Sequence, residues 1–174
     1  MRTMRRLTAV LLAPALLAGS SFAQTPNPLD AVPDKMPFDI PYGAPINLEH
    51  AQAAVAAAVA EAGKHGWKLN VAVLDSGANL VAFARMDNAQ LASIAIAEHK
   101  ARASVKYRRE TKAFENGIQL SNFHYVLTLD DVIASRGGIP LVEDGKLVGA
   151  IGCSGGTGSQ DEVACKVGAA TINK

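Results

Sequence analysis

The 174-residue chain has only two cysteines, four histidines and one tryptophan, and these shortages exclude several kinds of site. No Cys-x-x-Cys pair occurs, so a thioredoxin-like redox centre is not expected. No pair of histidines has the spacing of zinc ligands, so no structural metal is expected. Aromatic residues make up 5% of the chain, and the core is therefore expected to consist mainly of alanine, valine, leucine and isoleucine.

No apolar run continues past residue 23, and the run before it has the pattern of a secretory signal peptide. A basic segment, Arg2–Arg6, precedes the apolar stretch Leu7–Ala18, which is too short to span a bilayer comfortably. Ser21-Phe22-Ala23 then provides a small-x-small cleavage site, so we expect residues 1–23 to be removed. An uncleaved N-terminal anchor is the alternative. The mature protein is expected to be periplasmic or secreted, without stable membrane insertion.

The chain also has no block of basic residues outside this segment. It contains 17 Lys and Arg against 16 Asp and Glu. Residues 1–23 hold three of the arginines and no acidic residue, so their removal leaves 14 basic against 16 acidic side chains and a net charge near −2. A nucleic-acid partner is therefore not expected. The remaining residues, about 150, suit one domain with a substantial core.

Residues 24–46 form a proline-rich arm before this domain. Six prolines lie within 20 residues and disfavour both helix and sheet pairing there, at positions 26, 28, 33, 37, 41 and 45. The composition favours a disordered spacer. Met36, Phe38, Ile40 and Tyr42 alternate along the arm, so docking on a neighbouring subunit is the other interpretation.

Residues 47–174 alternate between helical and strand patterns, as is typical of an α+β domain. Asn47 is a good helix N-cap, and apolar residues recur at helical spacing until Gly63 and Gly66. No element is assigned to residues 112–132. The other expected elements are strands Leu69–Leu74 and Leu80–Met86, a helix from Leu91 to about Thr111, strands Ile139–Val142 and Leu147–Cys153, and a last helix from Ser159 to about Ile172.

The clearest local signal is Asp144–Gly145, between the last two expected strands. Both residues tolerate the positive φ that a two-residue hairpin turn needs, and Glu143 then faces Lys146 as an unlike charge. The second strand has a face of small residues, which another backbone or a flat ligand could approach closely. The glycine-rich residues 155–158 are either a tight turn or a site for a carboxylate.

Cys153 and Cys165 are both retained after removal of the signal peptide, in an oxidising compartment. A disulfide from the strand to the following helix is conceivable if the two Cα atoms lie within about 7 Å. Two separate small buried residues are the simpler interpretation.

Several stretches of this sequence resemble the GlcG/HbpS family of haem-binding proteins, also called the haem-degrading family and found as the C-terminal domain of PduO-type proteins. The resemblance covers roughly Leu48–Ile172 and rests on the stretches Val71–Val81, Arg85–Ala89, Ile96–Ala101, Arg108–Thr111 and Gly137–Glu162. It implies a profilin-like fold, in which helices flank a five-stranded antiparallel sheet, with the fifth strand from Tyr125–Ala134. It also implies a homo-oligomer.

The resemblance further implies an exported protein that binds haem non-covalently and acts in haem capture, buffering or sensing. The absence of Cys-x-x-Cys-His excludes c-type attachment. Arg85 and Lys100 match the family's Arg-Met-Asp and Lys-Ala motifs, and they are candidates for pairing with the haem propionates. For Lys100 the alternative is snorkelling along an alanine-rich stripe to water.

His99, beside Lys100 on the same expected helix, is the first candidate for the iron ligand, although the family does not reserve its position for histidine. His124 and Thr111 are the reserves, Thr111 because it matches the family's Arg-x-Thr position. A non-catalytic haem-binding protein is the favoured interpretation. The alternatives are a haem-degrading or other small-molecule enzyme that uses an Arg85/Lys100 pocket, and a structural subunit that binds a partner through the arm.

Overall fold

The computed structural model describes residues 27, 30–36 and 38–173 of the chain. The predicted signal peptide and its cleavage site lie outside these residues. The chain divides into a unit of residues 1–35 and a domain of residues 36–174. Among the described residues, no helix is long and apolar enough to cross a membrane.

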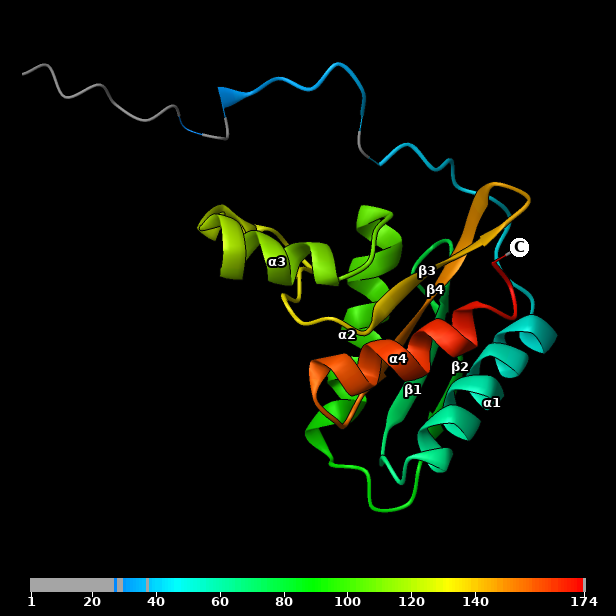
Figure 1. Cartoon of the computed structure of the whole chain (residues 1–174). Helices are drawn as coiled ribbons and strands as arrows, with labels where there is room; N and C mark the ends of the chain where they lie inside the picture. Colours follow the sequence, from blue (N-terminus) through cyan, green and yellow to red (C-terminus); the bar gives the residue numbers. More distant parts are fainter. Residues whose placement is uncertain (1–26, 28–29, 37, 174) are drawn as a thin grey trace, which may run out of the picture. The chain divides into compact units, whose positions relative to one another are not determined.

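The domain is an α+β fold, and its described residues form a four-stranded antiparallel sheet (Figure 1). The strand order across the sheet is β2-β1-β4-β3, so two hairpins meet where β1 pairs with β4. The strands are β1 (Asn70–Asp75), β2 (Leu80–Arg85), β3 (Gly138–Glu143) and β4 (Lys146–Ser154). The helices are α1 (Leu48–Lys64), α2 (Ala92–Tyr107), α3 (Lys112–Ser121), the 3-10 helix η2 (His124–Thr128) and α4 (Gly158–Ala169).

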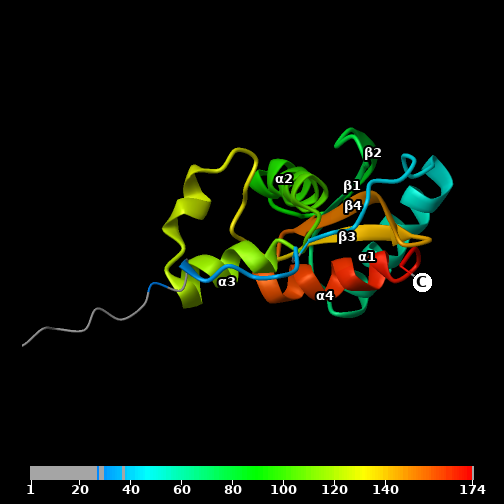
Figure 2. The ribbon, with the colours of Figure 1, turned by 90° about the horizontal axis from the view of Figure 1, so that it is seen from above.

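Helices cover both faces of the sheet (Figure 2). α1 and α4 lie against one face and against each other, while α2 lies along β4 and β1 on the opposite face. The alternation of side chains along β1 accounts for this, because Val71 and Val73 join the core beneath α1 and α4, and Ala72 and Leu74 pack with α2. In both views α3 lies on the opposite side of the domain from α1.

α2 approaches β4 closely because the facing residues are small. A Cβ atom at Gly152 would lie 2.1 Å from the carbonyl oxygen of Ala97 and 2.6 Å from the nitrogen of Ala101. The small-residue face of β4 therefore receives the backbone of α2. Of the two occupants expected from the sequence, a backbone is confirmed, and no room is left there for a flat ligand.

The Asp144–Gly145 hairpin is confirmed. The φ angle is 50° at Asp144 and 72° at Gly145, and Glu143 is the register partner of Lys146 across the turn. The carboxylate of Glu143 contacts the imidazole of His50 of α1 instead of Lys146, at 3.3 Å between Oε1 and Nδ1.

The predicted fifth strand is wrong for this structure. Residues 125–134 contribute no strand, because the segment begins within η2 and continues as turns. Val126 of η2 is buried against Phe114 of α3. The hydroxyl of Tyr107, on α2, donates a hydrogen bond of 2.7 Å to the carbonyl oxygen of Asp130. The segment is therefore held by helices and not by the edge of the sheet.

The helix predicted to end near Thr111 ends earlier, at Tyr107. α2 ends at Tyr107, since Arg108 adopts a left-handed conformation with φ of 54° and its nitrogen donates to the carbonyl oxygen of Ser104. The hydroxyl of Ser104 donates in turn to the carbonyl oxygen of Arg109 at 2.9 Å. α3 follows in the stretch to which the sequence assigned no element.

The second half of the proline-rich arm packs on its own domain. The carbonyl oxygen of Pro41 accepts a hydrogen bond from the nitrogen of Leu147 at 2.8 Å, and the nitrogen of Gly43 donates to the carbonyl oxygen of Leu147 at 2.8 Å. The hydroxyl of Tyr42 donates to a carbonyl oxygen at the end of α2 at 3.0 Å. The expectation of a disordered spacer therefore does not hold for residues 38–46.

Candidate functional site

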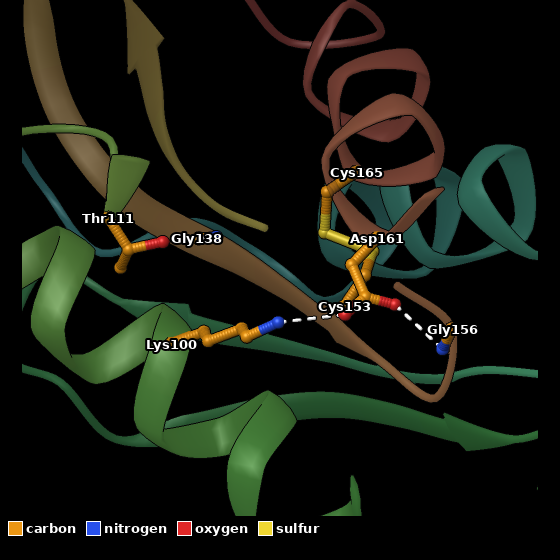
Figure 3. Close-up of a disulfide and its surroundings, with 7 residues drawn as sticks. All are labelled: Lys100, Thr111, Gly138, Cys153, Gly156, Asp161 and Cys165. Carbon is orange, nitrogen blue, oxygen red and sulfur yellow. Dashed lines mark hydrogen bonds and ion pairs between the residues drawn. A yellow bond between two sulfur atoms is a disulfide. The ribbon is translucent and has the colours of Figure 1, made fainter. Parts of the chain in front are cut away.

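Lys100 of α2 and Asp161 of α4 form an ion pair inside the domain (Figure 3). The Nζ atom of Lys100 lies 2.8 Å from Oδ2 of Asp161, and the two side chains are 1% and 3% exposed. Lys100 therefore does not snorkel to water, and the acidic group that it needs is supplied by the same chain. Because removal of either partner would leave a buried charge, the pair holds α4 against α2.

Asp161 also closes the glycine-rich loop before α4. Its Oδ1 atom accepts a hydrogen bond from the backbone nitrogen of Gly156 at 3.0 Å (Figure 3). Thr157 and Gln160 form a reciprocal capping box at the start of the helix. The backbone nitrogens of Gly156 and Thr157 are thus bonded to the protein's own side chains, which favours the tight turn over a site for an external carboxylate.

Cys153 and Cys165 form a disulfide, with Cα atoms 5.7 Å apart (Figure 3). The simpler interpretation of two separate residues is therefore wrong. The bond links the end of β4 to α4, and both cysteines are fully buried. Together with the ion pair of Asp161, it fixes the first turns of α4 on the sheet.

Thr111 is buried and connects the start of α3 to β3. Its hydroxyl oxygen accepts a hydrogen bond from the nitrogen of Gly138 at 2.9 Å, and its own nitrogen donates to the carbonyl oxygen of Gly138 at 3.0 Å. A Cβ atom at Gly138 would lie 2.3 Å from the carbonyl oxygen of Lys100. The side-chain methyl of Thr111 would lie 2.6 Å from the same Cβ atom, so Thr111 and Lys100 both pack closely against Gly138, each with a partner inside the protein.

The other predicted site residues lie in different surroundings. Arg85 ends β2 and is exposed, whereas Lys100 is buried, so the structure does not bring these two cations into one pocket. His99 is half-buried on α2, and its Nε2 is a buried atom without a hydrogen-bond partner among the described residues. His124 is exposed and begins η2.

A cleft of about 570 Å³ lies between α3, η2 and the arm, and we call it the aromatic cleft. Most of its walls are apolar, and its aromatic side chains are Phe38, Tyr107, Phe114, Phe123 and Tyr125. The rings of Tyr107 and Phe114 meet edge to face, with centroids 5.2 Å apart. None of the predicted site residues lines this cleft, but His124 lies in the chain between the lining residues Phe123 and Tyr125.

Arg109 is the cation of the aromatic cleft. Its Cζ atom lies 3.4 Å from the centroid of the Phe38 ring, and its Nε donates to the carbonyl oxygen of Tyr107 at 3.0 Å. No carboxylate among the described residues forms an ion pair with it. Burial lowers the pKa of Arg109, as expected for a cation that is partly removed from water, but a guanidinium remains charged at neutral pH. The cleft thus offers an uncompensated positive charge.

Sequence reasoning missed Arg109, although it stands in the stretch Arg108–Thr111. The signal that could have identified it is a doubled arginine at a helix end, followed by an aromatic-rich segment that reaches Tyr125. Phe38 has no such signal, since it lies in a part of the sequence far from the other lining residues.

Ser154 stands in a Gly-x-Ser-x-Gly pattern, Gly152–Gly156, which marks the nucleophile in many hydrolases. In this fold Ser154 is buried at the end of β4, and its hydroxyl donates to the hydroxyl of Ser93 at 3.1 Å. Its partner is therefore a second serine and not a histidine base, so the pattern does not form a hydrolase site.

The family model described as haem degrading protein HbpS-like matches residues 46–170. The chain belongs to the HbpS-like family. Among curated relatives, Protein GlcG of Escherichia coli strain K12 is 37% identical over 109 residues, which cover 63% of this chain and 81% of GlcG. The resemblance inferred from the sequence stretches is confirmed.

Solved structures of HbpS-like proteins share the fold. A double mutant of HbpS from Streptomyces reticuli has a TM-score of 0.70 and 28% sequence identity, over 83% of this chain and 98% of that chain. PduOC, solved as a complex with haem, has a TM-score of 0.67 and 26% identity, over 75% of this chain and 96% of that chain. The HbpS-like match includes every residue that lines the aromatic cleft except Phe38, which precedes it.

Proposed function

We propose that this protein binds haem non-covalently in the aromatic cleft and acts in haem capture, buffering or sensing. Its membership of the HbpS-like family supports this, as does its similarity to PduOC, which was solved with haem. The observation that supports this site is an unpaired cation in an apolar cleft. The guanidinium of Arg109 is half-buried between aromatic and aliphatic walls and has no carboxylate partner among the described residues.

The residues of the cleft fit an apolar macrocycle that bears carboxylates. The rings of Phe123 and Tyr125 are the more exposed aromatic parts of the lining, and the guanidinium of Arg109 suits a propionate by charge and by its forked geometry. Arg85 and Lys100, the propionate partners predicted from the sequence, do not line the cleft. We therefore assign the propionate contact to Arg109. When bound, the iron would supply ligand exchange and redox chemistry.

We assign the iron ligand to His124, because its imidazole is exposed and its two neighbours in the chain line the cleft. His99, the first choice from the sequence, is the second candidate. The Nε2 atom of His99 is free of partners among the described residues but buried, so its neighbours would have to move before iron could reach it. Thr111 would have to release the nitrogen of Gly138.

Haemin added to the mature protein is expected to give a Soret band, and Arg109→Gln is expected to weaken binding by about tenfold or more. The reason is that a hydrogen bond to a charged group contributes about 1.5–3 kcal/mol. His124→Ala is expected to move the Soret maximum, because the iron loses its protein ligand. An absorption titration measures both effects.

Arg85→Gln is the matched control, since it removes a guanidinium that lies outside the cleft. Its affinity for haemin is expected to equal that of the wild type. Equal affinities in Arg85→Gln and Arg109→Gln would contradict the cleft as the site. A band that moves in His99→Ala and not in His124→Ala would restore the ligand predicted from the sequence.

A haem-degrading oxygenase is the second candidate, because the description of the matched family names haem degradation. The haemin-loaded protein should be incubated with a reductant and oxygen. A Soret band that persists supports the binding function. Loss of the band with release of an open-chain tetrapyrrole supports the oxygenase.

We also propose that the protein is exported and assembles as a homo-oligomer. The signal-peptide pattern of residues 1–23 and the disulfide support export, and the exposed leucines Leu120 and Leu127 support assembly, at 77% and 68% exposure. The intact mass of periplasmic protein is expected to match a chain that begins at Gln24. A full-length product confined to the cytoplasm would contradict export.

A further inference from the structure

We propose that Phe38 of the arm is a positioning residue for Arg109 and gives the aromatic cleft its preference for ligands with a carboxylate. The inference rests on the proposed function of the cleft. Phe38 precedes residues 46–170, the part that matches the family. This wall of the site is therefore built by the arm and not by the family domain.

The contact between Phe38 and Arg109 is a stacked one. The Cζ atom of Arg109 lies 3.4 Å from the ring centroid, which is van der Waals distance, so the guanidinium lies flat over the ring. In that orientation the N–H groups point outward in the plane of the guanidinium and not into the ring.

The stacked guanidinium leaves its two terminal nitrogens available. The Nε atom of Arg109 donates to the carbonyl oxygen of Tyr107, whereas neither Nη atom has a hydrogen-bond partner among the described residues. Among the described residues, the completely buried side-chain atoms that lack a hydrogen-bond partner belong to Asn70 and His99. The Nη atoms of Arg109 also lack a partner but are not among these atoms, so neither is completely buried. The edge that would form two parallel hydrogen bonds to a carboxylate therefore has no partner among the described residues and is not completely buried.

The arm is anchored close to Phe38. The carbonyl oxygen of Ile40 accepts a hydrogen bond from Nη1 of Arg108 at 3.2 Å, and that of Pro41 accepts one from the nitrogen of Leu147 at 2.8 Å. These bonds fix the backbone two and three residues after Phe38. A ring held in this way restricts the rotamers of Arg109, which lowers the entropy that is lost when a carboxylate binds.

The test compares two metal-free probes, protoporphyrin IX and its dimethyl ester, which differ only in their carboxylates. The wild type is expected to prefer the free acid. Phe38→Leu keeps an apolar wall but removes the aromatic face, and it is expected to reduce this preference by roughly two- to thirtyfold, the range of a cation–π contact. Phe38→Trp is expected to restore the preference. Arg109→Gln should abolish it, and Phe38→Leu should then add no further loss.

A measurement without ligand separates this inference from the haem proposal. In urea unfolding of the free protein, the losses caused by Phe38→Leu and Arg109→Gln are expected to be non-additive, because the residues share one contact. Additive losses, or a preference for the free acid that is unchanged in Phe38→Leu, would overturn the positioning role. Failure of the wild type to bind either porphyrin would refute the haem function, while the unfolding cycle would still decide whether Phe38 holds Arg109.

Discussion

Replacement of Lys100 by methionine is expected to lower the free energy of unfolding of the domain by about 3–5 kcal/mol. Methionine is apolar and similar in length to lysine, so most of the packing around α2 is kept. The loss arises from Asp161, whose carboxylate would stay 3% exposed without its cation. The hydrogen bond from Gly156 to the other carboxylate oxygen is too weak to offset a buried charge.

Urea unfolding followed by circular dichroism measures this loss. The double variant Lys100→Met/Asp161→Asn removes both charges while an amide oxygen can still accept the hydrogen bond from Gly156, so most of the stability is expected to return. Lys64→Met is the matched control, because Lys64 is 68% exposed and pairs with Glu61 at the surface. Its stability is expected to be nearly that of the wild type. A Lys100→Met variant as stable as Lys64→Met would disprove the role of the buried pair.

Removal of the disulfide by Cys153→Ala and Cys165→Ala is expected to lower the free energy of unfolding by about 3 kcal/mol. The two cysteines are 12 residues apart, and cross-linking a loop of this size restricts the unfolded chain by that order of free energy. Alanine is preferred to serine because both positions are fully buried and a hydroxyl there would need a partner.

The comparison is made in urea with and without dithiothreitol. The wild type, unfolded and refolded in the reductant, is expected to lose as much stability as the double alanine variant. The variant itself is the control, since the reductant should leave its unfolding curve unchanged. A wild-type curve that does not respond to reduction would show that the bond contributes nothing.

The hairpins and the start of α1 could be predicted because their signals are local. The turn at Asp144–Gly145 needs two residues with positive φ, and the Asn47 side chain caps the nitrogen of His50 three residues away. The break after Tyr107 was missed, since it depends on a left-handed arginine and a serine hydroxyl that no propensity indicates. The prediction of a fifth strand was wrong because Val126 is buried against Phe114 of α3 and not in the sheet.

The contacts of the candidate site were harder to predict from the sequence, because they join segments that lie far apart in the chain. The family resemblance drew attention to Lys100 and Thr111, and the structure shows both engaged inside the protein. The partner of Lys100 lies 61 residues away in the chain, so the charge could be noticed but not its counterion. The stack of Phe38 on Arg109 joins the arm to the segment after α2, a contact that no spacing rule describes.

The pairing of the arm with β4 also determines where this domain begins. β1 ends opposite Gly149, so the first residues of β4 would have an open edge on that side if the arm were absent. Pro41 and Gly43 bond to Leu147 there, and the nitrogen of Ile46 donates to the carbonyl oxygen of Val148 at 2.9 Å. A chain shortened to the family boundary would expose unpaired backbone groups at the tip of the sheet, a template for self-association.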